Sequence, residues 1–237
     1  MSVVWHDLEC GSYHEDLELW RELARRHGDP VLEIGAGTGR VSLELARRGH
    51  RVVALDHDPV LLAELRRRAG RLALSGVLAD AREFELGRRF ALCLVPMQTI
   101  QLLTGASGRA GFLRCARAHL ERGGLLAAAI SEQLETYEVL DGSPAPVPDI
   151  CERDGVLYSS LPTAVRAEPG GYTLARRRET VSPGGSLSVQ EDRIHLDRLT
   201  AAELEREAGS QGFHPVGRAS VPATADYAGS TVVMLRA

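Results

Sequence analysis

Short apolar runs alternate with helical patterns through the first half of the chain. Five of the runs are short and apolar enough to be buried strands: residues 31–34, 51–56, 74–80, 90–95 and 125–130. Between them, apolar positions recur at helical spacing, most clearly at 40–48 and 112–120. Strands that alternate with helices predict an α/β fold built on a mostly parallel sheet.

The pattern changes after residue 130. A proline-rich stretch at 143–148 is followed by three runs of alternating apolar and polar residues: 156–161, 172–180 and 187–196. Pro-Gly-Gly at 183–185 separates the last two runs, which predicts an antiparallel hairpin. Residues 131–197 are therefore expected to form an antiparallel β insertion after the fifth strand.

Both ends of the chain carry helical signals. Leu17, Trp20 and Leu23 have helical spacing, and Gly28-Asp-Pro30 ends that helix. Near the other end, Thr200 and Glu203 form a capping box, and two further apolar runs predict a final antiparallel hairpin. We divide the chain into four parts: residues 1–30, 31–130, 131–197 and 198–237.

Composition removes several functional classes. The chain of 237 residues is 44% hydrophobic and has a net charge of −4, so no nucleic-acid partner is expected. Every basic residue is arginine, which excludes a lysine Schiff base and a lysine-bearing phosphate loop. The four cysteines are scattered, so no metal site is expected. Without a signal pattern or a membrane-length apolar run, a cytoplasmic location is expected, with no membrane partner.

Three glycines at alternate positions follow the first strand: Gly35, Gly37 and Gly39. Glycine lets the backbone turn sharply and lets a ligand approach without a Cβ in the way. The helix that follows offers free N–H groups at its start. The dinucleotide fingerprint Gly-x-Gly-x-x-Gly would need a glycine where the chain has Arg40, so that spacing fails.

With Glu33 two residues ahead of Gly35, this stretch resembles motif I of the class I S-adenosylmethionine (SAM) methyltransferases, E/D-x-G-x-G-x-G. The resemblance implies a Rossmann-like sheet of seven strands, the last antiparallel, and SAM as cofactor. It also implies a set of cofactor-binding residues at the strand ends: Glu33, Gly35, Ala36, Gly37, Gly39, Asp56, His57, Asp80, Ala81, Pro96 and Met97.

Individual roles follow from this resemblance. Asp56 ends the second strand, where a carboxylate can accept both hydroxyls of a ribose. His57 would cover the adenine, and a solvated histidine at a helix start is the alternative. Asp80 and the backbone N–H of Ala81 would read the adenine, although an aspartate at a strand end also serves as a turn residue. Pro96 and Met97 would border the methyl group.

The insertion resembles that of the sugar N-methyltransferases and of the glycine/sarcosine methyltransferases. In that branch it covers the substrate pocket or pairs subunits, and the N-terminal segment forms a lid. We therefore expect methyl transfer to N or O of a small-molecule acceptor. The oligomeric state stays open, and the edge strands of the insertion could pair across a homodimer. The candidate catalytic residues are Tyr13, Gln98 and His195, with side-chain packing, helix capping and a surface or core histidine as their respective structural alternatives.

Two departures from the family pattern leave other functions open. Ala91 replaces the usual acid of the fourth strand, and no convincing base is present, which favours a catalytically silent SAM-binding protein as the second hypothesis. The absence of Asn/Asp-Pro-Pro-Tyr disfavours methylation of a DNA amine or a protein glutamine, although a macromolecular acceptor stays open. A nicotinamide dehydrogenase is kept because Asp56 also suits NAD.

Overall fold

The computed structural model describes residues 2–140, 146–224 and 227–237. The chain forms two compact units. The core unit contains Tyr13–Glu132 and Leu199–Ala237, and the insertion unit contains Val4–Ser12 and Gln133–Arg198. Part of the predicted proline-rich stretch, residues 143–145, lies outside the described residues.

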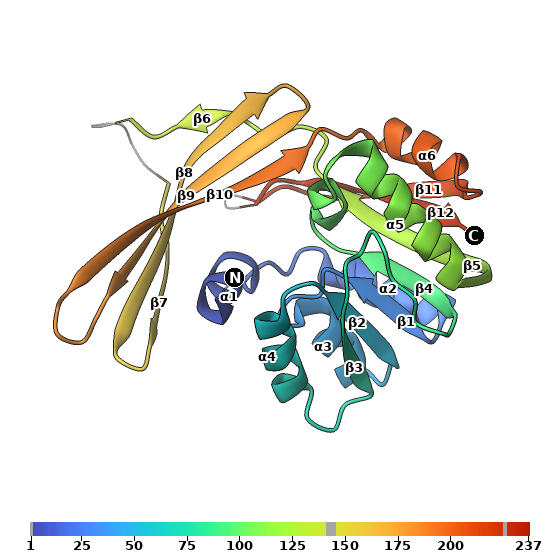
Figure 1. Cartoon of the computed structure of the whole chain (residues 1–237), viewed down its shortest axis with the longest axis horizontal. Coiled ribbons are helices and arrows are strands. Elements are labelled where there is room, and N and C mark those ends of the chain that lie inside the picture. Colours follow the sequence, from blue (N-terminus) through green and yellow to red (C-terminus); the bar gives the residue numbers. More distant parts are fainter. Residues whose placement is uncertain (1, 141–145, 225–226) are drawn as a thin grey trace. The chain divides into compact units, whose positions relative to one another are not determined.

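The core unit is built on a seven-stranded sheet with the order β11-β12-β5-β4-β1-β2-β3 (Figure 1). β1 to β5 run parallel to their neighbours, and β12 pairs antiparallel with β5. The strands are β1 (Val31–Ile34), β2 (Val52–Asp56), β3 (Leu74–Leu78), β4 (Phe90–Val95), β5 (Leu120–Ile130), β11 (His214–Val221) and β12 (Ser230–Arg236). The predicted fold class, including the antiparallel last strand, is confirmed.

Helices cover both faces of the core sheet, which explains why its strands are apolar runs. Val31 packs on one face with Trp20 and Val41, while its neighbour Leu32 packs on the other face with Phe112. The helices are α2 (Leu17–His27), α3 (Arg40–Arg47), α4 (Pro59–Ala69), α5 (Gly105–His119) and α6 (Ala201–Gly209), with a short 3₁₀ helix η1 (Thr99–Leu102).

Two helix starts follow the predicted capping chemistry. Asp58 accepts hydrogen bonds from the N–H groups of Val60 and Leu61, with Pro59 in the first turn of α4. Thr200 and Glu203 form the reciprocal capping box of α6. These caps satisfy backbone donors that would otherwise lack partners, and they fix where each helix begins.

The insertion unit is an antiparallel sheet with the order β10-β9-β8-β6, and β7 also pairs with β8. Val181 lies opposite Leu187, so the Pro-Gly-Gly hairpin is confirmed. The elements are α1 (Val3–Cys10), β6 (Tyr137–Glu138), β7 (Asp149–Arg153), β8 (Val156–Glu168), β9 (Gly171–Val181) and β10 (Leu187–Asp197).

The N-terminal thirty residues contain two helices that belong to different units. The sequence predicts one helical segment ending at Pro30, but residues 4–12 belong to the insertion unit. Glu9 on α1 binds Arg178 on β9 through two hydrogen bonds of 2.7 Å, and both side chains are buried. Trp5 packs edge-on against Tyr158. These long-range contacts hold α1 on the insertion sheet.

No helix in the described part of the chain is long and apolar enough to cross a membrane.

Candidate functional site

A glycine loop at the carboxyl end of β1 forms the centre of the candidate site. Gly35, Gly37 and Gly39 all have positive φ, at 69°, 55° and 98°. A Cβ on Gly35 would lie 2.5 Å from the Cγ2 of Thr99, so only glycine fits beneath η1. Gly39 is the N-cap of α3, and the loop therefore delivers the start of that helix to the sheet edge.

Asp56 clamps this loop from the end of the neighbouring strand. Its Oδ2 accepts a hydrogen bond from the Gly37 N–H at 2.7 Å, and its Oδ1 accepts one from the Asp58 N–H at 2.9 Å. The side chain is buried. Because β1 and β2 are parallel neighbours, Asp56 and the glycine loop meet at the same sheet edge, as the sequence predicts.

Glu33 lies beneath the loop and is buried. Its carboxylate accepts a hydrogen bond from the Ser42 hydroxyl on α3. Burial raises the pKa of Glu33 to about 7, while the Ser42 hydrogen bond and the charge of Arg40 oppose the shift. Glu33 is thus poised between its neutral and charged forms at neutral pH.

Tyr13 belongs to a buried cluster built around Asp16. The Asp16 carboxylate receives both Nη atoms of Arg40, at 2.5 and 2.8 Å, and the indole N–H of Trp20 at 2.7 Å. Arg40 also donates to the Tyr13 carbonyl and lies 5.0 Å from the centre of its ring. The cluster fixes Tyr13 against the first residue of α3, beside the glycine loop.

The Tyr13 phenol is buried, and its ring stacks at a tilt on Tyr227 with 4.9 Å between centroids. Burial raises the pKa of the phenol, with a further contribution from Asp16 and an opposing hydrogen bond with Ser230. The roles of Asp16 and Arg40 were missed by the sequence reasoning. The i, i+4 spacing of Asp16 and Trp20 is a local signal for one contact, but nothing in the sequence pairs Asp16 with Arg40.

Asp80 lies just beyond β3, beside the end of β2. The Ala79 N–H donates to the Asp56 carbonyl at 3.1 Å, which brings the Asp80–Ala81 segment to the same edge as Asp56. The Arg82 guanidinium holds the Asp80 carboxylate, and its hydrogen bonds lower the pKa of Asp80 to about 2. His57 is exposed, with its Nδ1 3.6 Å from Asp56 Oδ1.

The loop after β4 contains Pro96, Met97 and Gln98 and lies beside the end of β5. Met97 has a φ of 54°, unusual for a residue with a side chain. Gln98 donates to the Ser131 hydroxyl at 3.0 Å. Gln101 donates to the Ser131 carbonyl and accepts from its N–H. Both glutamines therefore tie the β4 loop to the end of β5. No sequence signal pointed to Ser131.

His195 belongs to the insertion unit, on β10. Its Nδ1 lies 3.9 Å from an oxygen of Glu168, and its ring covers Gly171, where a Cβ would lie 2.7 Å from Nε2. The other predicted residues all belong to the core unit, where the strand ends bring them together.

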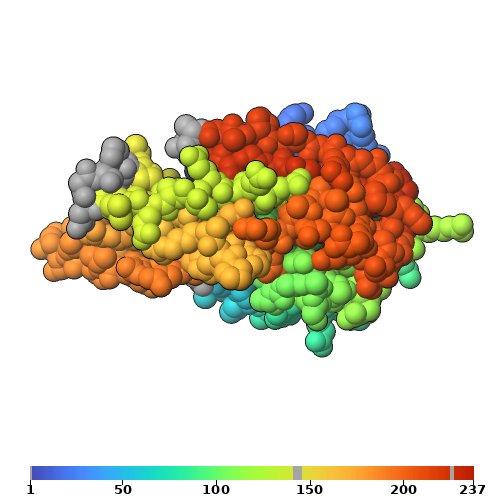
Figure 2. All heavy atoms as spheres, turned by 90° about the horizontal axis from the view of Figure 1, so that it is seen from above, coloured from blue at the N-terminus to red at the C-terminus, as the bar shows by residue number. Residues whose placement is uncertain are grey.

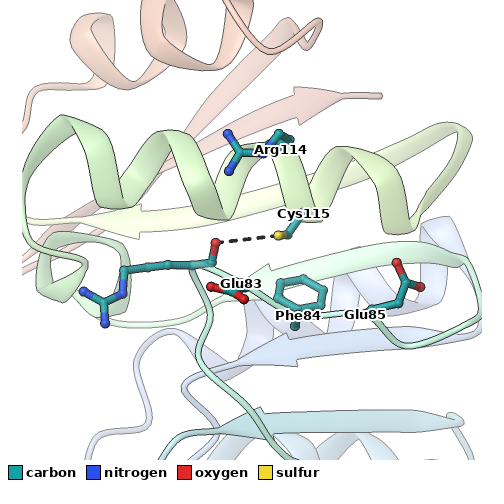
Figure 3. Close-up of a pocket in the computed structure, with 6 residues that line it drawn as sticks. Glu83, Phe84, Glu85, Arg114 and Cys115 are labelled. Atoms are coloured by element: carbon teal, nitrogen blue, oxygen red, sulfur yellow. Dashed lines mark hydrogen bonds between the residues drawn. The ribbon is translucent and has the colours of Figure 1, made fainter.

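A separate pocket of about 450 Å³ lies between the β3–β4 connection and α5 (Figure 3). Its lining residues are Arg82, Glu83, Phe84, Glu85, Arg114 and Cys115. None of the predicted site residues lines it. Within the described ranges, no cluster of three or more histidine, cysteine or acidic side chains forms a metal site.

Comparison with known proteins agrees with this geometry. Residues 31–124 match a family described as a methyltransferase domain. The chain is 45% identical over 53 residues to ribosomal RNA small subunit methyltransferase A from Anaeromyxobacter dehalogenans (strain 2CP-C). That segment is 22% of this chain and spans only 19% of the length of that curated relative.

Solved structures resemble almost the whole chain. The CcbJ methyltransferase from Streptomyces caelestis has a TM-score of 0.71 at 22% identity, covering 98% of this chain and 95% of its own. The sugar N-methyltransferase KedS8 from Streptoalloteichus sp ATCC 53650 has a TM-score of 0.74 at 16% identity, covering 98% of this chain and 90% of its own. CalS10, an amino pentose methyltransferase from Micromonospora echinaspora, has a TM-score of 0.72 at 19% identity, covering 98% of this chain and 94% of its own.

Residues 31–124 therefore match a methyltransferase domain, and the chain as a whole has the fold of the class I methyltransferases. The predicted fold class is thus confirmed from a second direction.

Proposed function

We propose that the protein transfers the methyl group of SAM to a nitrogen of a small molecule, with amino sugars as the favoured acceptors. The observation that carries the proposal is the glycine loop clamped by Asp56, inside a segment that matches a methyltransferase domain. The descriptions of KedS8 as a sugar N-methyltransferase and of CalS10 as an amino pentose methyltransferase favour nitrogen over oxygen.

The strand ends fit SAM in hydrogen-bonding capacity. The glycine loop leaves its backbone uncovered by Cβ atoms at the start of α3. Each Asp56 oxygen uses one lone pair on a backbone N–H, which leaves a second lone pair on each for the ribose hydroxyls. In this proposal the cofactor is surrounded by the residues that the sequence predicts for it, from Glu33 to Met97.

When bound, SAM supplies a methyl group already activated on a sulfonium sulfur. The task of the chain is to align the acceptor with that methyl group and to exclude water. We assign Tyr13 and Gln98, both in the core unit, to acceptor contact, and we keep His195 of the insertion unit as a separate candidate. Because burial raises the pKa of Tyr13, its phenol stays protonated at neutral pH and acts as a hydrogen-bonding group, not as a base.

A small acceptor agrees better with the charge of the protein than RNA does. The net charge is −4, whereas proteins that bind nucleic acid generally present a basic surface. The similarity to the ribosomal RNA methyltransferase is confined to 53 residues, so it does not carry that substrate over. A cytoplasmic location is part of the proposal, supported by four free cysteines.

A catalytically silent SAM-binding protein is the second candidate. Gln98 and Gln101 are both engaged with Ser131, which favours structural roles for them, and Ala91 replaces the usual acid of β4. This candidate predicts binding of S-adenosylhomocysteine without transfer to any acceptor.

The proposal also includes a homodimer formed through the insertion unit. β10 is an edge strand, and residues 187–194 are exposed apart from Asp192, which is half-buried. Figure 2 shows one face of this orange part of the chain at the molecular surface. The strand register places four exposed apolar side chains on one face of the sheet: Ile150, Leu157, Leu187 and Val189. α1 contacts the other face through Ser160. A strand that lies at the edge of the described sheet, next to apolar side chains on one sheet face, is suited to pairing with a second copy of itself.

Light scattering on a size-exclusion column tests the dimer. A dimer is expected for the wild-type protein, a monomer for Val189→Lys, and a dimer again for the control Val60→Lys on α4, whose side chain is similarly exposed. A wild-type monomer would contradict the dimer without affecting the enzymatic proposal.

The enzymatic proposal is tested by incubating the protein with methyl-labelled SAM and a cell extract separated into small-molecule and macromolecular fractions. Label in the small-molecule fraction supports the proposal, and mass spectrometry then identifies the acceptor. Label in RNA or protein overturns the substrate class. Thermal stabilisation by S-adenosylhomocysteine without any label favours the silent binder, and a preference for NADH revives a dehydrogenase.

A further inference from the structure

Arg82 holds Asp80 in a way that the sequence motifs did not anticipate. Its Nη2 lies 2.6 Å from Asp80 Oδ2, and its Nε lies 3.0 and 3.1 Å from the two carboxylate oxygens. Its backbone N–H adds a fourth contact, 2.8 Å from Oδ1. A bidentate arginine fork fixes both the position and the plane of a carboxylate, which a lysine or a single hydrogen bond does not.

Arg82 is itself anchored on α5 from several directions. Its Nη1 donates to the hydroxyl of Thr104, the N-cap of α5, at 3.1 Å. Its backbone carbonyl accepts a hydrogen bond from the Cys115 thiol, with 3.7 Å between sulfur and oxygen; this bond is drawn dashed in Figure 3. The Arg82 side chain is therefore held at the start of α5, and its backbone is held further along the same helix.

Gly111 inside α5 makes room for this arrangement. A Cβ on Gly111 would lie 2.8 Å from the Arg82 carbonyl oxygen. Gly108 meets a different need, because a Cβ there would lie 1.6 Å from the Leu103 carbonyl oxygen. Glycine is unfavourable within a helix, so its presence at position 111 indicates a packing requirement, which is the close approach of the Arg82 backbone.

The contacts fix both oxygens of Asp80. The Arg82 Nε–H is shared between them, 3.0 Å from Oδ1 and 3.1 Å from Oδ2. Each oxygen also has one closer donor, the Arg82 backbone N–H for Oδ1 and Nη2 for Oδ2. The same contacts lower the pKa of Asp80 to about 2, so the carboxylate stays charged and can only accept. Because the side chain is 45% exposed, this charged acceptor is open to a further donor, which matches an exocyclic amine.

We propose that Arg82 is a positioning residue for base recognition: it fixes Asp80 so that the carboxylate receives the amine of the adenine, and it thereby sets the preference of the site for adenine over a 6-oxo purine. This inference rests on the proposed SAM-binding function. Asp80 makes the contact with the base, and Arg82 acts only through Asp80.

The test is a comparison of two ligands by isothermal titration: S-adenosylhomocysteine, and its analogue with hypoxanthine in place of adenine. The wild-type protein is expected to prefer the adenine ligand by about tenfold or more, because the analogue offers an oxygen where Asp80 needs a donor. Arg82→Gln should lose most of this preference, by weakening the adenine ligand about tenfold while changing the analogue little.

Three further variants separate the effect of the Arg82 fork from general effects on binding. Arg82→Lys retains the charge without the fork and should keep only part of the preference. Gly111→Ala displaces Arg82 from behind and should reduce the preference without removing a polar group. Arg114→Gln, on α5 and lining the same pocket as Arg82, is the control and should bind both ligands like the wild type. Melting temperatures of each variant establish that it is folded.

A double-mutant cycle with Asp80→Ala assigns the effect to the pair. If Arg82 acts through Asp80, the second substitution adds little to the first. Arg82→Gln with an unchanged adenine preference, or with fully additive losses, would overturn the inference. Failure of the wild-type protein to bind S-adenosylhomocysteine would instead overturn the proposed function itself.

Discussion

The core sheet and the insertion sheet use charged side chains in opposite ways. In the core, the acids that matter come at the ends of strands, as Asp56 and Asp80 do, and they bind backbone N–H groups or a nearby arginine. In the insertion, charges lie in the middle of strands. Arg178, inside β9, pairs with Glu9 from α1 and with Asp192 from β10.

This difference follows from how each sheet is covered. Helices bury both faces of the core sheet, so only its strand ends are open to polar chemistry. The insertion sheet is antiparallel and receives α1 on one face, where a buried ion pair selects the docking position of that helix. The core sheet is thus organised to present a site, whereas the charges of the insertion sheet serve assembly.

The largest effect that separates the two units is expected from Glu9→Ala. This change leaves the Arg178 guanidinium, which is 5% exposed, without its main partner, and we expect a loss of about 3–5 kcal/mol in the stability of the insertion unit. Hydrogen exchange should show opening of α1 and β9 while β1 and β2 stay protected. Glu18→Ala removes an acid that is 83% exposed and paired with Arg21, and it should change stability by less than about 1 kcal/mol.

The double variant Glu9→Leu/Arg178→Met sharpens this prediction. Replacing both charges with apolar groups removes the uncompensated buried charge, so most of the stability should return. Equal destabilisation by the single and double variants would contradict the account of α1 docking.

The next effect concerns the buried acid of the core. The pKa of Glu33 is raised from 4.5 to about 7 by burial, so folding favours its protonated form. Its contribution to stability is therefore complete below about pH 4.5 and is lost as the pH rises through 7. Between pH 5 and 8 the wild type should lose about 2.5 kcal/mol that Glu33→Gln retains. Urea unfolding at both pH values measures this difference, and parallel pH curves for the two proteins would contradict it.

A smaller effect is expected from Gly35→Ala. The backbone at φ +69° disfavours a side chain, and the new methyl group would meet Thr99. The strain of about 1–3 kcal/mol should weaken S-adenosylhomocysteine binding roughly 10- to 100-fold, as measured by titration. Gly184→Ala, in the β9–β10 hairpin, is the control and should leave binding unchanged. Wild-type affinity in Gly35→Ala would show that the glycine loop does not approach the cofactor.

The sequence predicts those parts of the molecule whose causes are local. The apolar runs, the glycine loop, the acid at the end of β2 and the caps at Asp58 and Thr200 depend on neighbouring residues, so pattern alone locates them. The hairpin at Pro183-Gly-Gly is local in the same sense.

Contacts between distant residues are not encoded in any local pattern. Glu9 and Arg178 are 169 residues apart, so residues 1–30 read as one helical segment although two units share them. Ser131 binds glutamines 30 and 33 residues away, and Asp16 binds Arg40 across 24 residues. The strand-end residues that we propose for the cofactor were therefore locatable from sequence, while the side chains that fix Tyr13 and Gln98 emerged only from the fold.

The most direct test of the central claim is methyl transfer to a matched pair of acceptors. The purified protein is incubated with methyl-labelled SAM and either an amino sugar or the same sugar with a hydroxyl in place of the amine, over a panel of such pairs. The account predicts label in at least one amino sugar, recovered as an N-methyl product, and none in its hydroxyl counterpart. Transfer to the hydroxyl sugars alone, or to RNA with no small acceptor labelled, would contradict it.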